Sequence, residues 1–113
     1  MAYDILIKGG TVFDGDGSPG AVADVGIKGG RVAEIGELGN ASAELLINAA
    51  GKYVAPGFVD ITNHSDTHLA LFHSPALESM AMQGVTTIVG GNCGASLAPR
   101  VSEQSLDAIK KWA

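Results

Sequence analysis

The sequence has little of several features that mark particular classes of protein. It holds one cysteine, Cys93, among 113 residues, so an intrachain disulfide is excluded and the composition fits a reducing cytosol. No apolar run approaches the roughly 20 residues that a helix needs to cross a bilayer. The segment Met1–Asp4 lacks the basic and apolar regions of a signal peptide. We therefore expect a cytoplasmic protein with no membrane partner.

Positive charge is also scarce. Seven Lys and Arg residues stand against 12 Asp and Glu residues, which gives a formal net charge of −5. Nucleic-acid affinity depends on neutralising phosphates with Lys and Arg, so we expect no nucleic-acid partner. Glycine, by contrast, is abundant: 16 residues are about twice the ordinary usage and predict many tight turns between short strands.

The first half of the chain repeats a short phrase. Ile7–Gly10 is matched by Ile27–Gly30, and each is followed by a polar residue and Val. Because paired glycines supply the positive-φ positions of a tight turn, the repeat predicts two hairpins of one design. Common hairpin chemistry explains the repeat equally well. Other elements expected here are strands over 3–8, 11–13, 21–27 and 45–47 and a turn over 48–52.

Residues Gly15–Gly20 spell a literal G-x-G-x-x-G. A dinucleotide site would require a helix to follow, with its N-terminus facing the pyrophosphate. Here residues 21–27 alternate like a strand, and Pro19 lies inside the motif. We therefore expect a plain loop between two strands.

The second half has a different pattern. An apolar strand over 53–61 is interrupted by Pro56-Gly57 and ends in a polar cluster. Ser74 is a good N-cap, Pro75 suits the first helical position, and Glu78 completes a capping box. The sequence therefore predicts a helix that opens at Ser74-Pro75 and is stopped by Gly84.

A second β-α unit follows the first. The β-branched run Val85–Val89 is typical of a strand buried in a parallel sheet. A glycine-rich loop over 90–99 and a helix over 103–112 come next. Two β-α units in succession predict a parallel sheet, with polar loops at the carboxyl ends of its strands, where ligands bind in α/β folds.

Two polar clusters stand at those strand ends, Asp60–Asp66 and Gly90–Gly94. If the strands are parallel neighbours, the clusters meet, and the imidazole of His64, the thiolate of Cys93 and the carboxylate of Asp66 would suit zinc. Each has an ordinary alternative, because a cysteine after a buried strand is usually a small packed residue and Asp66 suits the start of a helix. His68 and His73, which precede the helix or lie at its start, are weaker candidates.

At these residues the sequence resembles a known family. Tyr3–Val12 and Ala23–Val32 resemble the opening strands of amidohydrolase-superfamily enzymes, and Val54–Asp60 is similar to the start of their first barrel strand. Gln83–Thr87 followed by Gly90–Gly94 narrows the resemblance to the N-acyl-D-amino-acid deacylase branch. The string that ends in Asn92-Cys93-Gly94 is the specific part of the match.

The resemblance implies an α/β fold with an added β part. Residues 1–53 would form part of a small β-sandwich that is completed by a distant C-terminal segment. Residues 54–113 would form the first two β-α units of a (β/α)8 barrel, which is incomplete here because a whole barrel takes about 250 residues. The chain would thus be the N-terminal portion of a longer enzyme.

The resemblance also implies a function, the zinc-dependent hydrolysis of a small-molecule linear amide such as an N-acyl-D-amino acid. Cys93 would be a zinc ligand and His64 a second or vestigial one. Three residues would lie beside the ligands or the substrate: Asp66, Asn92 and Asn63. The general base would be an aspartate beyond residue 113, so no catalytic residue is expected in this chain, which by itself should be inactive.

One departure from the family pattern concerns the first barrel strand, which normally ends in His-x-His. Here that place reads Thr62-Asn63-His64, and a threonine hydroxyl is a poor zinc ligand beside an imidazole. Two alternatives follow: a catalytically inactive scaffold of the same fold, or another amide or ring hydrolase such as a dihydropyrimidinase-like enzyme. The loop that contains Cys93 argues against the second. The acyl group, the preferred amino acid, the number of metal ions and the oligomeric state stay open.

Overall fold

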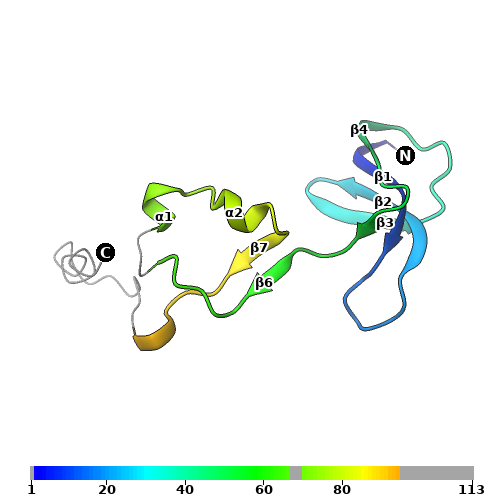
Figure 1. Ribbon diagram of the computed structural model, residues 1–113. Helices are drawn as coiled ribbons and strands as arrows, with labels where there is room; N and C mark the ends of the chain where they lie inside the picture. Colours follow the sequence, from blue (N-terminus) through cyan, green and yellow to red (C-terminus); the bar gives the residue numbers. More distant parts are fainter. Residues whose placement is uncertain (1, 67–69, 95–113) are drawn as a thin grey trace. The chain divides into compact units, whose positions relative to one another are not determined.

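The chain divides into two compact units, each with its own sheet (Figure 1). The computed structural model describes residues 2–66 and 70–94. The units are Met1–Pro56 and Gly57–Ala113. Within the described residues, no helix has the length and apolar character needed to cross a membrane. The helix expected over 103–112 lies outside them.

The first unit is a five-stranded sheet. Its strands are β1 (Tyr3–Val12), β2 (Ala21–Lys28), β3 (Arg31–Gly36), β4 (Ala43–Asn48) and β5 (Tyr53–Val54). The order is β3-β2-β1-β4, and β5 pairs with the second half of β1. The strand β2 runs antiparallel to its two neighbours β1 and β3, whereas β4 and β5 run parallel to β1. The strands expected over 21–27 and 45–47 are therefore confirmed.

Of the two expected hairpins, one is confirmed and one is wrong. Gly29 and Gly30, with φ of 59° and 72°, turn the chain between β2 and β3. Gly9 and Gly10 instead lie inside β1, which continues through them. The register with β2 shifts between Ile7 and Gly10, and the Gly9 N–H donates to Asp24 Oδ1 at 2.9 Å. The first glycine pair therefore forms a β-bulge, because a side-chain acceptor on β2 satisfies the unpaired N–H.

The loop between β1 and β2 contains the G-x-G-x-x-G string. Two aspartates stabilise it locally: Asp14 Oδ1 accepts the Asp16 N–H at 3.0 Å, and Asp16 Oδ1 accepts the Ser18 N–H at 2.7 Å. The strand β2 follows directly, beginning at Ala21. The expectation of a loop between two strands is confirmed.

The core of the first unit is small. Leu6 is completely buried, which stabilises the unit by about 1.5–3 kcal/mol, and Tyr3, Val25 and Ala49 are also buried. The Tyr3 ring lies over Gly26, where a Cβ would come within 2.6 Å of the ring. The Tyr3 hydroxyl donates to Glu34 Oε2 at 2.6 Å. This hydrogen bond, with partial desolvation and the nearby carboxylate charge, raises the pKa of Tyr3.

The second unit contains the two parallel strands that the sequence predicts. They are β6 (Phe58–Asp60) and β7 (Val85–Ile88), paired in parallel. The Pro56-Gly57 interruption separates β5, which belongs to the first sheet, from β6, which belongs to the second. The strand expected over 53–61, with an interruption at Pro56-Gly57, is therefore two strands, because proline and glycine interrupt the pairing.

The connection from β6 to β7 holds two short helices, α1 (Ala70–His73) and α2 (Glu78–Ala81). The expected helix start at Ser74 is wrong. The Ser74 N–H donates to Ala70 O and ends α1, and the Leu77 N–H donates to Ser74 O to close a turn. Leu77 is the N-cap of α2 in a left-handed conformation, with φ of 43° and no side-chain capping bond. Ser74 thus finds a backbone partner in the preceding helix, and no capping box forms.

The close approach of Gly10 to neighbouring residues gives a stability prediction. A Cβ on Gly10 would lie 2.6 Å from Val54 Cγ2 and 3.1 Å from Ala49 Cβ. We expect Gly10→Ala to lower the free energy of unfolding by about 1–3 kcal/mol through overpacking, measured by urea denaturation. In a Val54→Ala background, which removes the nearest methyl group, the cost should fall. An equal cost in both backgrounds would contradict the explanation.

Candidate functional site

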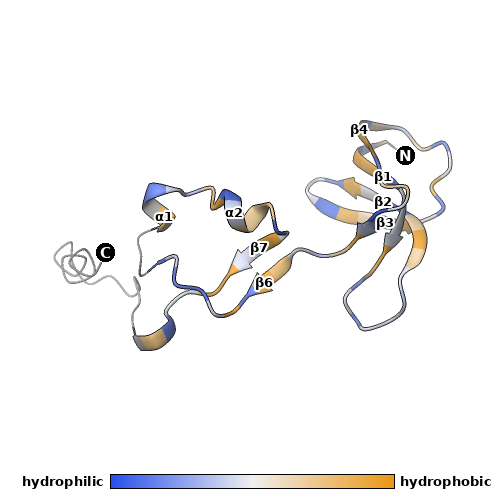
Figure 2. Ribbon diagram, viewed as in Figure 1, coloured by the Kyte–Doolittle hydropathy of each residue, from blue (hydrophilic) through white to orange (hydrophobic). Residues whose placement is uncertain are grey.

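The candidate site lies where β6 and β7 end. The Val89 N–H donates to Asp60 O at 2.8 Å, so the strands stay paired to the last residue of β6. Beyond Ile61, the segment that follows β6 is mostly polar (Figure 2). Because the strands are parallel, the loops after Asp60 and after Ile88 leave the same edge of the sheet. The expectation that the two polar clusters meet is confirmed by the contacts between them.

The closest contact between the clusters joins the two predicted ligands. His64 Nε2 and Cys93 Sγ lie 3.3 Å apart. A tetrahedral zinc ion with ordinary bond lengths of about 2.3 Å to sulfur and about 2.0 Å to nitrogen separates such ligands by about 3.5 Å. An imidazole and a thiol are also the donor types that zinc prefers. The two residues therefore fit a zinc ion both in chemistry and in spacing.

Cys93 is held in an uncommon backbone conformation. It lies in the 3-10 turn η1 (Asn92–Gly94) with φ of 60° and ψ of 27°, in the left-handed region. For a residue with a Cβ this costs about 1–2 kcal/mol, so the surrounding loop must hold it there. Cys93 is exposed and His64 half-buried. The thiol is thus free of disulfide bonding and accessible from solvent.

Asn63 stabilises the loop that carries His64. It is buried, with 7% of its surface exposed. Its Nδ2 donates to Asp60 Oδ2 at 2.9 Å, and its Oδ1 accepts the Ser65 N–H at 2.8 Å. The side-chain bond from Asn63, with a further bond from the Thr62 N–H, lowers the pKa of Asp60. Asn63 therefore holds both ends of the segment 60–65, which contains His64.

Asp66 and Asn92 join this loop to the loop of Cys93. Asp66, with 5% of its surface exposed, accepts the Gly91 N–H at 2.8 Å through Oδ2. Asn92 Nδ2 donates to Asn63 O and to Val89 O, each at 3.0 Å. Both residues therefore make contacts that cross between the clusters.

The other predicted residues lie elsewhere. Thr62 is exposed two residues beyond the end of β6, and His73 is exposed at the end of α1. His68 lies outside the described residues. Within residues 2–66 and 70–94, no group of three or more His, Cys, Asp or Glu is arranged to hold a metal ion. Among the described residues, the candidate ligands that lie together are thus His64 and Cys93.

Sequence reasoning passed over two residues that support the site. Asp60 accepts bonds from Asn63 and Thr62, and the D-x-x-N spacing after a strand is a signal that could have found it. Met80, on α2, brings its sulfur to 3.5 Å from Asn63 Nδ2. A methionine on the apolar face of a helix is usually a core residue, so no sequence pattern predicts this contact.

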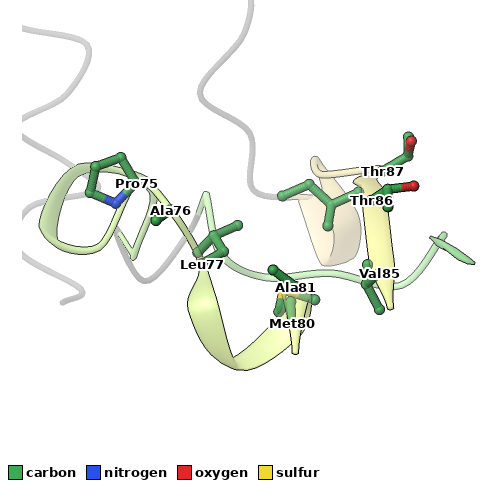
Figure 3. Close-up of a pocket in the computed structure, with 9 residues that line it drawn as sticks. Pro75, Ala76, Leu77, Met80, Ala81, Val85, Thr86 and Thr87 are labelled. Carbon is green, nitrogen blue, oxygen red and sulfur yellow. The ribbon is translucent and has the colours of Figure 1, made fainter. Parts of the chain in front are cut away.

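The second unit also has an apolar hollow, which is not the site. It measures about 210 Å³ and lies between α2 and β7, with Leu77, Met80 and Ala81 on one side and Val85 on the other (Figure 3). None of the candidate ligands lines it. The hollow therefore belongs to the packing of helix against strand.

Three comparisons place the chain among known proteins. A D-aminoacylase of Alcaligenes xylosoxydans xylosoxydans is 45% identical over 97 residues, which cover 86% of this chain and 20% of the relative. The crystal structure of an N-acyl-D-glutamate deacylase from Bordetella bronchiseptica, complexed with zinc and a phosphonate inhibitor, matches with a TM-score of 0.81 and 46% identity over 88% of this chain and 20% of that one.

A third match is a D-aminoacylase studied for its binuclear metal centre, with one-metal activation and second-metal attenuation. It has a TM-score of 0.79 and 46% identity, and it covers 88% of this chain and 21% of that one. No family model matches the chain. The chain spans about a fifth of the length of the relatives it matches.

The bond from Asn63 to Asp60 gives a prediction for pH dependence. A lowered pKa means that the ionised Asp60 stabilises the folded loop above the ordinary aspartate value of about 3.9. This contribution is lost as pH falls through the folded pKa. We expect Asn63→Ala to raise the pKa of Asp60 toward its ordinary value, measured by NMR titration of the carboxyl carbon.

Asp16 serves as the internal reference for that titration. Its pKa is lowered by bonds to Ser18, in the first unit, and it should not move in Asn63→Ala. An unchanged Asp60 pKa, or an equal shift at both carboxyl groups, would show that Asn63 is not the cause.

Proposed function

We infer that this chain belongs to the N-acyl-D-amino-acid deacylase branch of the amidohydrolases. We therefore propose that the protein hydrolyses a linear amide of the N-acyl-D-amino-acid type and that it uses zinc to do so. The 3.3 Å approach of His64 to Cys93 carries this proposal. The solved relative that binds zinc and a mimic of the tetrahedral intermediate supports it. The activity is that of the complete protein, because the chain spans about a fifth of such enzymes.

We also propose how the two units correspond to domains of such an enzyme. Residues 1–53, which lie in the first unit, would be the first part of a β-sandwich, and residues 54–113, which include the whole second unit, would be the first two β-α units of a (β/α)8 barrel. The parallel pairing of β6 with β7 across α1 and α2 supports the barrel assignment. The polar residues follow the carboxyl ends of these strands, and barrel enzymes carry their active sites at that end of the barrel. This position also supports the barrel assignment.

Each residue at the strand ends has a role in this proposal. Cys93 would hold zinc as a thiolate, and His64 would hold it through Nε2, the atom that faces the sulfur. When bound, zinc supplies Lewis-acid polarisation of the amide carbonyl and a water of lowered pKa. Asn63 keeps the His64 loop in place through Asp60 and Ser65. This chain would supply part of the coordination shell of the zinc ion, and it would be inactive by itself.

Thr62 bears on the number of metal ions. It occupies the place of the first histidine of the family's His-x-His, and its N–H donates to Asp60 Oδ1 at 3.0 Å. A hydroxyl is a weak zinc ligand compared with an imidazole. We propose that the protein binds one zinc ion per chain, the state that is described as active in the related D-aminoacylase with a binuclear centre.

Metal analysis of the complete protein tests the zinc site. We expect one zinc per chain in the wild type, loss of that zinc in Cys93→Ala, and at least tenfold weaker binding in His64→Ala, because a ligand is removed. His73→Ala is the matched control, since His73 is an exposed histidine of the same unit. The zinc-loaded protein should hydrolyse N-acyl-D-amino acids.

Absence of zinc from the wild type, together with absence of amidase activity, would contradict the proposal. That outcome would favour the alternative, a catalytically inactive scaffold that keeps the fold and has lost the metal.

Restoring the family's histidine tests the metal count. We expect Thr62→His to raise the zinc content above one per chain when zinc is in excess, because a second imidazole would then stand two residues from His64. Elemental analysis measures the content, and Thr62→Asn, which adds an amide of similar size to imidazole without a strong zinc ligand, is the control. A content that stays at one in Thr62→His would show that the position does not govern the number of ions.

A further inference from the structure

The loop of Cys93 is held by a buried carboxylate from the neighbouring loop. Asp66 Oδ2 accepts the Gly91 N–H at 2.8 Å, across 25 residues of sequence. Asp66 is 95% inaccessible, with 5% of its surface exposed. A charge-assisted hydrogen bond of this length in a buried place is among the stronger ones. Asp66 thus fixes the backbone two residues before Cys93.

Gly90 shows how closely this carboxylate fits the loop. A Cβ on Gly90 would lie 2.8 Å from Asp66 Oδ2 and 2.9 Å from its Cγ. The Gly90 backbone does not need a positive φ, so the glycine serves the approach of the carboxylate and not the turn itself. The carboxylate and the glycine therefore form a matched pair.

The strained conformation of Cys93 indicates what the bond accomplishes. A left-handed cysteine costs about 1–2 kcal/mol, and such a residue keeps its conformation only where neighbours determine it. On one side of Cys93, Gly91 is tied to Asp66 and Asn92 is tied to Asn63 O and Val89 O. The contacts that hold the loop are thus the contacts that direct the Cys93 sulfur toward His64.

We propose that Asp66 is a positioning residue of the metal site, which acts through the Gly91 N–H to present the Cys93 sulfur to zinc. This inference rests on the proposed zinc site. Asp66 is neither a ligand nor a group that touches substrate in this proposal. Its effect is carried by the Cys93 ligand, so its removal should weaken zinc binding only while Cys93 is present.

A double-mutant cycle on the complete protein tests this coupling. We expect Asp66→Ala to weaken zinc binding about 10- to 100-fold, the usual effect of removing a residue that orients a ligand, measured by competition with a chromophoric chelator. In a Cys93→Ser background, titrated at higher zinc concentrations because the serine hydroxyl is a weaker ligand, Asp66→Ala should change the affinity by less than about threefold. Asp66→Asn keeps an oxygen for the Gly91 N–H and should restore most of the affinity.

Cobalt substitution gives a second readout at the same atom. In the Co²⁺-loaded wild type, the thiolate-to-metal charge-transfer band reports the Cys93–metal bond, and Asp66→Ala should weaken or shift it. Asp4→Ala is the matched control, because Asp4 Oδ2 likewise accepts a glycine N–H, that of Gly29 at 2.6 Å, in the first unit. It should leave both the affinity and the band unchanged.

Gly90→Ala provides an independent variant if Asp66→Ala does not fold. The added methyl group would displace the carboxylate, and we expect at least a tenfold loss of zinc affinity. If the wild type binds zinc, and both Asp66→Ala and Gly90→Ala bind it with the same affinity, the role of Asp66 is overturned and the proposed zinc site is not. An equal loss from Asp66→Ala with and without Cys93 would overturn that role as well. A wild type that binds no zinc would overturn the proposed function and this inference together.

Discussion

The parallel pairing of β6 with β7 is the interaction on which the candidate site depends. It carries two segments that are 29 residues apart, at His64 and Cys93, to one edge of a sheet. The bond from the Val89 N–H to Asp60 O keeps that pairing intact at the point where the loops diverge. Since side chains alternate along a strand, a slip of one residue would turn the loops away from each other. The register therefore sets the meeting of imidazole and thiol.

Polar contacts between the loops complete what the strands begin. Asp66 and Asn92 bond backbone groups of the neighbouring loop, and Asn63 bonds Asp60 and the Ser65 N–H. These bonds hold the two loops in which His64 Nε2 and Cys93 Sγ lie 3.3 Å apart. Buried polar residues are stable only with such partners. The buried polar residues of the second unit thus determine the shape of its loops. The apolar hollow between α2 and β7 is lined by other residues.

The similarity to deacylases is the reason for proposing a zinc site at His64 and Cys93. The match to deacylases extends over most of this chain but over only about a fifth of the length of those enzymes. A catalytic zinc usually has three protein ligands and one open position. In the proposed site, His64 and Cys93 would be two of these ligands. In the proposed site, Thr62 would stand where the resemblance expects a histidine, while His64 Nε2 and Cys93 Sγ lie 3.3 Å apart.

The sequence by itself determined the features that local chemistry controls. It predicted the turn at Gly29-Gly30, the loop at Gly15–Gly20, the two strands that meet in parallel, and the polar clusters at their ends. The same local pattern failed at Gly9-Gly10, where Asp24 from a neighbouring strand accepts the free N–H and a bulge replaces the turn.

Tertiary structure alone decided the contacts between distant residues. The helix start moved from Ser74 to Leu77 because the Ser74 N–H already had a partner in α1. The bond of Asp66 to Gly91 joins residues that are 25 positions apart in the sequence. The left-handed conformation of Cys93 depends on the whole loop around it. Sequence patterns report propensities over a few residues, whereas these features follow from which groups the fold brings within hydrogen-bonding distance.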